Sequence, residues 1–208
     1  MNPSVKNLPI VSLSLNPAID LTYEVPSLIH DQKSRATSTH YDPGGTGINV
    51  GRALEKLNKN SHTCCIIAGK MGEFLEAMLH QELNNITSLK VSGETRINTT
   101  IIQQTPYSQY EVNATGPSIP PAQLDEIISQ FLRLCGQGIG ILTGSLSPAT
   151  PTSTYQKINT ALKQQGGRAI IDAPVAILKE AINSQPFLIK PNLHELEILQ
   201  NKTLLTLE

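Results

Sequence analysis

Two short polar motifs near the N-terminus contain residues that could bind hydroxyl groups or anions. The first, NPAID at residues 16–20, directly follows an apolar run, and its Asp20 could accept hydrogen bonds from hydroxyls. The second, at residues 42–50, places Gly44 and Gly45 before a helical pattern. Glycines there let a ligand approach the backbone N–H groups at the positive end of a helix dipole. Taken alone, the first motif is equally well a turn or a cap, and the second is more often a simple tight turn.

Cationic residues and a late polar segment add further candidates. Arg96 carries a guanidinium group, whose fork of N–H donors suits a phosphate, and Lys33 offers a second positive charge. In isolation, either residue would be interpreted as a solvated surface charge. In the late segment, Asn192 and Glu195 lie three residues apart just after a proline. This spacing also predicts a capping box at the start of a helix.

The elements that must position these residues alternate between strands and helices. Short apolar runs with β-forming residues are predicted as strands, at residues 10–15, 63–68, 139–143, 168–171 and 187–189. Amphipathic stretches separate them, and this alternation predicts an α/β fold with a mostly parallel sheet. The carboxyl end of the first strand leads directly into Asp20, and open α/β sheets bind their ligands at that edge.

Two helical stripes and two exceptional regions complete this pattern. One stripe is formed by Val50, Ala53, Leu54 and Leu57, and the other by Leu124, Ile127, Ile128 and Phe131. Each stripe is predicted to pack on the sheet. The regions 21–41 and 96–113 contain extended segments without an intervening helix, so they are predicted to pair as a small second sheet.

Composition and charge narrow the classes of partner. The chain has 208 residues, a formal net charge of -1 and 39% hydrophobic residues, which is typical of an ordinary α/β protein. Lys and Arg are spread along the chain, so we expect neither a nucleic-acid nor a membrane partner. The three cysteines form no CxxC pair and are interpreted as core residues in a reducing compartment, which favours the cytoplasm. His40, His62, His80 and His194 show no metal-ligand spacing.

Further motifs follow in a fixed order along the chain. They are Lys33 with Arg35, TRIN at residues 95–98, TGSL at 143–146 and KPNLHE at 190–195. Together with Asp20 and the Gly44-Gly45 turn, these motifs resemble those of the ribokinase-like (phosphofructokinase-B) sugar kinases, from about residue 12 to residue 204. The resemblance implies a doubly wound, mostly parallel sheet flanked by helices, with a small β lid at about residues 21–41 and 96–113.

The resemblance also implies roles for individual residues. The residues expected to hold sugar hydroxyls are Asp20, Gly44, Gly45 and Asn49. Those expected at the phosphate end of the acceptor are Arg96, Ser145 and Lys33. ATP and Mg²⁺ are the implied cofactors. Lys190, Asn192 and Glu195 are expected to place the triphosphate, and Glu195 is expected to reach the metal through water.

One part of the family pattern is not found in this sequence. In the family, a late Gly-Ala-Gly-Asp segment supplies the catalytic carboxylate and an anion-binding helix N-terminus, which phosphoryl transfer needs. No such segment occurs in residues 1–208. We therefore expect an incomplete ribokinase-like domain whose base lies beyond residue 208, and no catalytic residue is assigned. A sheet that stops after its middle strands leaves an unpaired edge, so the isolated chain is expected to be marginally stable or oligomeric.

The expected function is ATP-dependent phosphorylation of a sugar phosphate, of the fructose 6-phosphate, fructose 1-phosphate or tagatose 6-phosphate class. Arg96 and Lys33 favour such an acceptor over a free pentose or a nucleoside. Two alternatives stay open: a catalytically inactive sugar-phosphate-binding remnant, and one part of a split, interrupted or shortened gene product. The resemblance also implies a homodimer formed through the lid.

Overall fold

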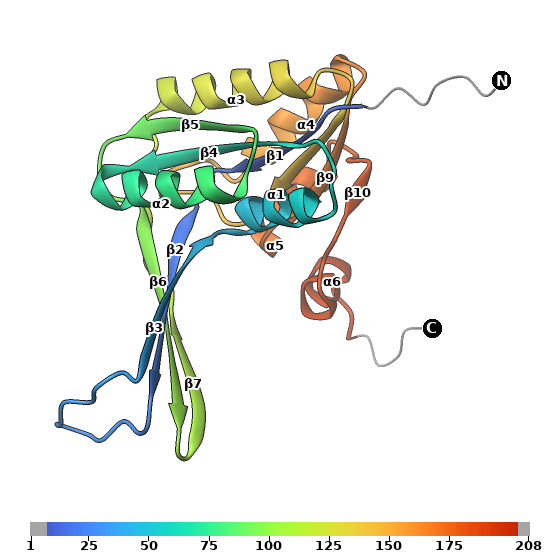
Figure 1. Cartoon of the computed structure of the whole chain (residues 1–208). Helices are drawn as coiled ribbons and strands as arrows, with labels where there is room; N and C mark the ends of the chain where they lie inside the picture. The colour runs from blue at the N-terminus through green and yellow to red at the C-terminus, as the bar shows by residue number, and fades with distance from the viewer. Residues whose placement is uncertain (1–7, 204–208) are drawn as a thin grey trace.

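A six-stranded, fully parallel sheet forms the body of the molecule (Figure 1). The computed structural model describes residues 8–203, so residues 1–7 and 204–208 of the expected domain lie outside the described residues. The strand order is β10-β9-β8-β1-β4-β5. The strands are β1 (Ile10–Ser14), β4 (His62–Ala68), β5 (Ile86–Val91), β8 (Ile139–Thr143), β9 (Arg168–Asp172) and β10 (Leu188–Ile189). The predicted mostly parallel α/β sheet is confirmed.

Helices cover both faces of this sheet. On one face, α1 (Thr46–Lys56) and α2 (Gly69–Glu82) enclose a small core that includes Ile48 and Leu75. On the other face, three helices enclose the larger core: α3 (Pro121–Cys135), α4 (Thr154–Gln164) and α5 (Val175–Ile182). The last helix, α6 (Leu193–Gln200), follows β10 and buries none of its residues.

A four-stranded second sheet projects from the body (Figure 1). Its order is β3-β2-β6-β7, with strands β2 (Ala18–Val25), β3 (Ser38–Gly44), β6 (Arg96–Gln104) and β7 (Tyr107–Val112). Both regions predicted to form a second sheet contribute to it. The first region extends from residue 18 to residue 44 rather than from 21 to 41. Backbone pairing starts directly after the turn at Asn16 and Pro17, with Ala18 opposite Gly44. Asp20 therefore lies within a strand rather than in a turn.

Strand alternation gives the second sheet two different faces. Leu21 lies between Tyr41 and Thr99 on one face, and the next row on that face joins Thr39, Tyr23, Ile101 and Tyr110. On the opposite face, Asp20 lies between Asp42 and Asn98. Because successive side chains of a strand point to opposite sides, the apolar and the polar residues are separated. The side chains of Tyr41, Tyr110 and Val112 remain exposed on the apolar face.

One predicted packing face is wrong. The stripe of Val50, Ala53, Leu54 and Leu57 on α1 was expected to pack on the sheet, but Ala53 is exposed and Leu57 is 67% exposed. The buried residues of α1 are instead Gly47, Ile48 and Gly51. The helix therefore approaches the sheet through its glycines, one turn apart, and this close approach leaves Ala53 and Leu57 exposed and Val50 and Leu54 only half-buried.

The glycines of α1 contact small side chains of the sheet. A Cβ atom at Gly47 would lie 2.8 Å from the carbonyl oxygen of Leu13, and one at Gly51 would overlap Oγ1 of Thr63. β1 presents Ser12 to this face, and the Ser12 hydroxyl donates to Thr63 Oγ1 at 3.1 Å. α1 lies close to β1 and β4 because the helix has no side chains at these two positions and the strands have only small ones.

Other sequence predictions agree with the structure. On α3, Ile127 and Phe131 are fully buried, and Leu124 and Ile128 pack against the same core. The three cysteines are free and buried. Within residues 8–203, no helix has both the length and the apolar composition required to cross a bilayer.

The outer edge of β10 has no neighbouring strand among the described residues. Phe187 and Leu188 are exposed beside it, at 58% and 45%. An unpaired edge with apolar neighbours can pair with another chain. The expected effect of this edge on stability and assembly stays a prediction.

The glycine contact of α1 generates a stability prediction. Gly51→Ala forces a methyl group into Thr63, so we expect a loss of about 1–3 kcal/mol in the free energy of unfolding, measured by urea denaturation. In the Thr63→Ala background the obstructing oxygen is gone, so the same substitution should cost clearly less. Equal costs in the two backgrounds would show that α1 does not pack through Gly51.

Candidate functional site

A polar pocket of about 250 Å³ opens at the carboxyl ends of β1 and β8, where β2, β6 and α1 begin. Five of the seven residues predicted to bind the acceptor line it: Asp20, Gly45, Asn49, Arg96 and Ser145. They come from four separate parts of the chain. The fold brings them together because parallel strands end at one edge of the sheet, where α/β sheets bind ligands.

Asp20 presents one carboxylate oxygen to this pocket. Asn98, its neighbour on β6, donates from Nδ2 to Asp20 Oδ1 at 2.9 Å. The whole carboxylate group lies against the backbone of Gly44, where a Cβ atom would overlap both of its oxygens. Gly44 does not line the pocket itself. Its contribution is to leave room for the carboxylate, which can then accept a hydrogen bond from a ligand hydroxyl.

The glycine turn places the N-terminus of α1 at the pocket. Gly45 has a φ of 101°, and a Cβ atom there would lie 3.0 Å from Pro17 Cα, so this position favours glycine. α1 begins at the next residue, Thr46, and no side chain caps it. Gly45, Thr46 and Asn49 all line the pocket. The positive end of the helix dipole and its unpaired N–H groups are therefore available to an electronegative ligand.

Arg96 supplies the positive charge of the pocket. Its Nε and Nη2 atoms donate to the carbonyl oxygen of Asn16 at 3.2 and 2.9 Å, and Nη1 donates to the carbonyl of Ala114 at 3.4 Å. Burial lowers the pKa of the guanidinium from its usual value, while the charge of Asp20 acts in the opposite direction. Among the described residues, no carboxylate lies within ion-pair distance of Arg96. Its charge is oriented by neutral carbonyls and is free to attract an anion.

Asn16 connects Arg96 with the loop that follows β8. Its Nδ2 atom donates to Ser145 Oγ at 3.1 Å and to the carbonyl of Leu146 at 3.3 Å. Ser145 follows Gly144, whose φ of 86° turns the chain away from the end of β8. The hydroxyl of Thr143 is buried at the same edge and has no hydrogen-bond partner within the described residues. Such a group can take up a ligand or a water.

Six lining residues were not among the predicted site residues: Ser14, Asn16, Thr46, Asn98, Thr143 and Gly144. Asn16, Thr46, Asn98 and the Thr143-Gly144 pair belong to the motifs that carry the family resemblance, so proximity in sequence was a usable signal for them. Ser14 had no such signal, because nothing in the sequence distinguishes it from the other residues of its strand.

Lys33 lies far from this pocket within the same chain. It belongs to the loop between β2 and β3, at residues 26–37, where it is exposed. This loop forms the far end of the second sheet (Figure 1). The role expected for Lys33 at the phosphate therefore stays a prediction.

The predicted nucleotide residues lie beyond the pocket, after β10. Lys190 forms an ion pair with Asp172, with Nζ 3.2 Å from Oδ2. Asn192 and Glu195 form the predicted capping box: Glu195 N donates to Asn192 Oδ1 at 2.9 Å, and Asn192 N donates to Glu195 Oε2 at 2.8 Å. Their roles toward a nucleotide stay predictions.

These residues fit only the outer part of an ATP and Mg²⁺ site. Mg²⁺ is usually held by one or two carboxylates together with water and substrate phosphates. The capping box uses Oε2 of Glu195, which leaves Oε1 to contact a hydrated ion. Within residues 8–203, no group of three or more His, Cys, Asp or Glu side chains could hold a metal by itself. The role expected for Glu195 toward the metal stays a prediction.

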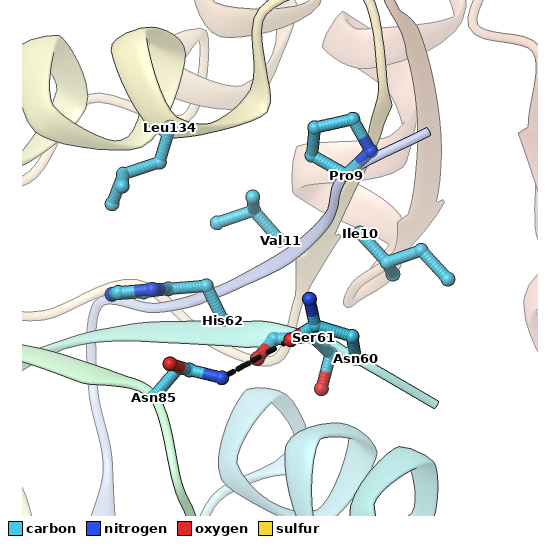
Figure 2. A pocket seen from close by; sticks show the side chains of 8 residues that line it. All are labelled: Pro9, Ile10, Val11, Asn60, Ser61, His62, Asn85 and Leu134. Atoms are coloured by element: carbon cyan, nitrogen blue, oxygen red, sulfur yellow. Dashed lines mark hydrogen bonds between the residues drawn. The ribbon is translucent and has the colours of Figure 1, made fainter. Parts of the chain in front are cut away.

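A second hollow at the opposite edge of the sheet is a weaker candidate. It measures about 200 Å³ and is lined by Pro9, Ile10, Val11, Asn60, Ser61, His62, Asn85 and Leu134 (Figure 2). None of these is an Asp, Glu, Lys or Arg. Asn85 donates to the side chain of Asn60 and to the carbonyl of Ser61, so its amide group is already engaged. The pocket at Asp20 and Arg96 has both charges and groups available to a ligand.

The fold and the order of these residues match those of the pfkB family. The model of that family, described as pfkB family carbohydrate kinase, matches residues 5–208. The chain belongs to this family.

Individual relatives agree with this assignment. The chain is 33% identical over 187 residues to 1-phosphofructokinase of Bacillus subtilis, covering 90% of this chain and 61% of the relative. It is 30% identical over 195 residues to tagatose-6-phosphate kinase of Staphylococcus epidermidis, covering 92% and 62%. A structure of the tetrameric inhibited form of phosphofructokinase-2 from Escherichia coli superposes with a TM-score of 0.88 at 27% identity, covering 96% and 66%. The chain thus spans about three fifths of the length of these curated relatives.

The environment of Arg96 generates a prediction about anions. Inorganic phosphate should raise the thermal midpoint of the chain, by about 2–4 °C for each 1 kcal/mol that binding adds to the free energy of unfolding, in a scanning fluorimetry series. Arg96→Met should remove this effect, because the charge that attracts the anion is gone. Arg133→Met, on the exposed side of α3, is the matched control and should behave like the wild-type chain. Protection that survives in Arg96→Met would place the anion elsewhere.

Proposed function

We propose that this chain binds the acceptor of an ATP-dependent sugar-phosphate kinase. The observation that carries the proposal is the pairing, in one pocket, of the Asp20 carboxylate with the Arg96 guanidinium, whose charge is not neutralised by a contact. A carboxylate accepts hydrogen bonds from sugar hydroxyls, and a guanidinium donates to phosphate oxygens. A sugar phosphate is the class of ligand that requires both.

The acceptor would lie with its hydroxyls toward α1 and its phosphate toward β6 and the loop after β8. Asp20 Oδ2 and the Asn49 amide would contact hydroxyls, and Gly44 and Gly45 allow the close approach. The remaining N–H groups of Arg96 and the hydroxyl of Ser145 would contact the phosphate. The relatives named 1-phosphofructokinase and tagatose-6-phosphate kinase support a fructose or tagatose phosphate as the acceptor.

ATP and Mg²⁺ complete the proposed reaction. Bound ATP would supply the transferred phosphoryl group, and Mg²⁺ would neutralise part of its charge. Lys190 and Asn192 are proposed to contact the triphosphate, and Glu195 the hydrated metal. Lys190 would have to exchange Asp172 for a phosphate. Its side chain is 65% exposed, and ion pairs open to solvent contribute little to stability.

A homodimer formed through the second sheet is part of the proposal. Its apolar face leaves Tyr41, Tyr110 and Val112 exposed beside Tyr23 and Ile101. A contiguous exposed apolar face of this kind marks an interaction site. In such a dimer, Lys33 of one copy could contact the pocket of the other, since the loop at residues 26–37 does not reach the pocket of its own chain.

The proposed compartment is the cytoplasm. Three free, buried cysteines with no disulfide among the described residues support a reducing environment.

The function is tested by comparing ligands that differ in one group. Fructose 6-phosphate, fructose 1-phosphate and tagatose 6-phosphate should raise the thermal midpoint more than fructose, ribose or adenosine at the same concentration. Arg96→Met should abolish the difference, with a loss in affinity of about 10-fold to 100-fold, as for hydrogen bonds to a charged group. Gly44→Ala should weaken the sugar phosphates while protection by inorganic phosphate persists, because it displaces Asp20 only. Equal protection by the neutral ligands would contradict the proposal, and binding without phosphorylation by ATP would reduce it to a binding role.

The dimer is tested by placing a charge on the apolar face. Tyr110→Glu should convert a dimer into a monomer in sedimentation velocity at micromolar concentration, because burying an unpaired carboxylate in an apolar interface is unfavourable. Thr100→Glu introduces the same charge on the polar face of the adjacent strand and is the matched control. A wild-type chain that sediments as a monomer, or a dimer that tolerates Tyr110→Glu, would contradict this interface.

A further inference from the structure

Arg52 contacts three separate elements beside the pocket without lining it. It belongs to α1, one turn after Asn49, and its side chain is 20% exposed. Its Nε and Nη2 atoms donate to the two carboxylate oxygens of Glu82, the last residue of α2, at 2.6 and 3.2 Å. Its Nη1 atom donates to the carbonyl of Pro43 at 3.2 Å and to Oδ1 of Asn49 at 3.3 Å.

Glu82 determines where the third nitrogen of this guanidinium points. A guanidinium group is planar, and two parallel hydrogen bonds to one carboxylate fix both its plane and its rotation. With Nε and Nη2 held in this way, Nη1 can only face the end of β3 and the first turns of α1. There it meets Pro43, which immediately precedes the Gly44-Gly45 turn. Asp42 lies 3.9 Å from Nη2 and adds a weaker attraction on the same side.

The contact with Nη1 determines the orientation of the Asn49 amide. A guanidinium group has donors only, so the atom of Asn49 that faces it must be the carbonyl oxygen Oδ1. The amide nitrogen Nδ2 is then the free end of the group, and within the described residues it has no hydrogen-bond partner. Asn49 lines the pocket together with Asp20. The free donor of Asn49 and the free acceptor of Asp20 therefore belong to the same site.

We infer that Arg52, held by Glu82, is a positioning residue that locks the Asn49 amide with its nitrogen toward the sugar. This inference rests on the proposed function, because it names the group that prepares the sugar end of that site. Without Arg52, the Asn49 amide would rotate and offer oxygen or nitrogen with similar frequency. An acceptor would then repel the lone pairs of a sugar hydroxyl that already donates to Asp20.

The arrangement of Asp20 and Asn49 also determines which hydrogen-bonding groups the sugar must have. Asp20 Oδ1 already accepts a hydrogen bond from Asn98, and the carboxylate can accept a further one from the ligand. Asn49 Nδ2 donates one hydrogen bond to it. A hydroxyl group can both donate and accept, so it can satisfy both side chains at once, whereas a group that only accepts, such as an ether or a carbonyl oxygen, can satisfy Asn49 alone.

The first experiment needs no ligand. Side-chain ¹⁵N relaxation of the Asn49 amide should show a restricted group in the wild-type chain and fast motion in Arg52→Met. Glu82→Gln leaves Arg52 in place but weakens its anchor, so it should give an intermediate result even if Arg52→Met folds poorly. Arg133→Met is the matched control and should leave the Asn49 signal unchanged. Equal mobility of Asn49 in the wild-type and Arg52→Met chains would overturn the inference.

The second experiment measures coupling in binding. By isothermal titration with fructose 6-phosphate, Asn49→Ala and Arg52→Met should each raise the Kd by about 10-fold, and the double variant should also show about 10-fold rather than about 100-fold. A double variant that loses the product of the two factors would show that Arg52 acts independently of Asn49. An Arg52→Met chain that is less stable but binds with unchanged Kd would show a purely structural role. Either result would overturn the inference.

The two experiments separate this inference from the proposed function. If the wild-type chain binds no sugar phosphate, the proposed function fails, and the role of Arg52 at a sugar site fails with it, although a restricted Asn49 amide would still show the local contact. If the wild-type chain binds and Asn49 is not held by Arg52, only the inference fails.

Discussion

The contact between two glycines of α1 and the small residues of the sheet determines where the pocket lies. Gly47 and Gly51 have no side chains, so the helix axis comes close to β1 and β4, against Ser14 and Thr63. A helix held at the usual distance by leucines would begin farther from the end of β1. The close packing instead places Gly45, Thr46 and Asn49 opposite Asp20, and the pocket is formed between them. The same close packing explains why β1 has serines on this face, since larger residues there would push the helix away.

The second sheet combines two tasks in one set of strands. Its polar face carries Asp20 and Asn98. Its apolar face carries Leu21 and Tyr23, which also belong to β2, the strand between β3 and β6. Near the body, the apolar face is covered by α2, where Ile19 and Ile97 join a core with Leu75 and Leu79. Farther out, Tyr41, Tyr110 and Val112 are exposed on this face, whereas Val25 and Gln103 at its far end are buried. The proposed ligand site and the proposed dimer interface are therefore the two sides of a single layer of backbone.

The sequence was sufficient to predict most of the architecture and much of the pocket. The alternation of β-rich runs and amphipathic stretches predicted the parallel sheet. The resemblance to the sugar kinases, which the short polar motifs carry, implied the meeting of Asp20, Asn49, Arg96 and Ser145. The α1 face was predicted wrongly because a rule based on aliphatic periodicity cannot recognise a helix that packs through glycines. The spacing of Gly47 and Gly51 was the available signal. Asn98 was missed because its role, a hydrogen bond to Asp20, depends on the register between two strands that are distant in sequence. Arg52 was missed for a similar reason, since its partner Glu82 lies on another helix.

The strand β2 also constrains how this protein can change in length. Asp20 and Leu21 are adjacent, yet one faces the pocket and the other faces the apolar side. Inserting or deleting one residue between the turn at Asn16 and the middle of β2 would exchange the two faces, placing a leucine in the pocket and a carboxylate in the core. Insertions of two residues would preserve the faces but shift every pairing with β3 and β6. Length variation during evolution is therefore admissible in the loop at residues 26–37, and is effectively forbidden in the eight-residue strand that precedes it.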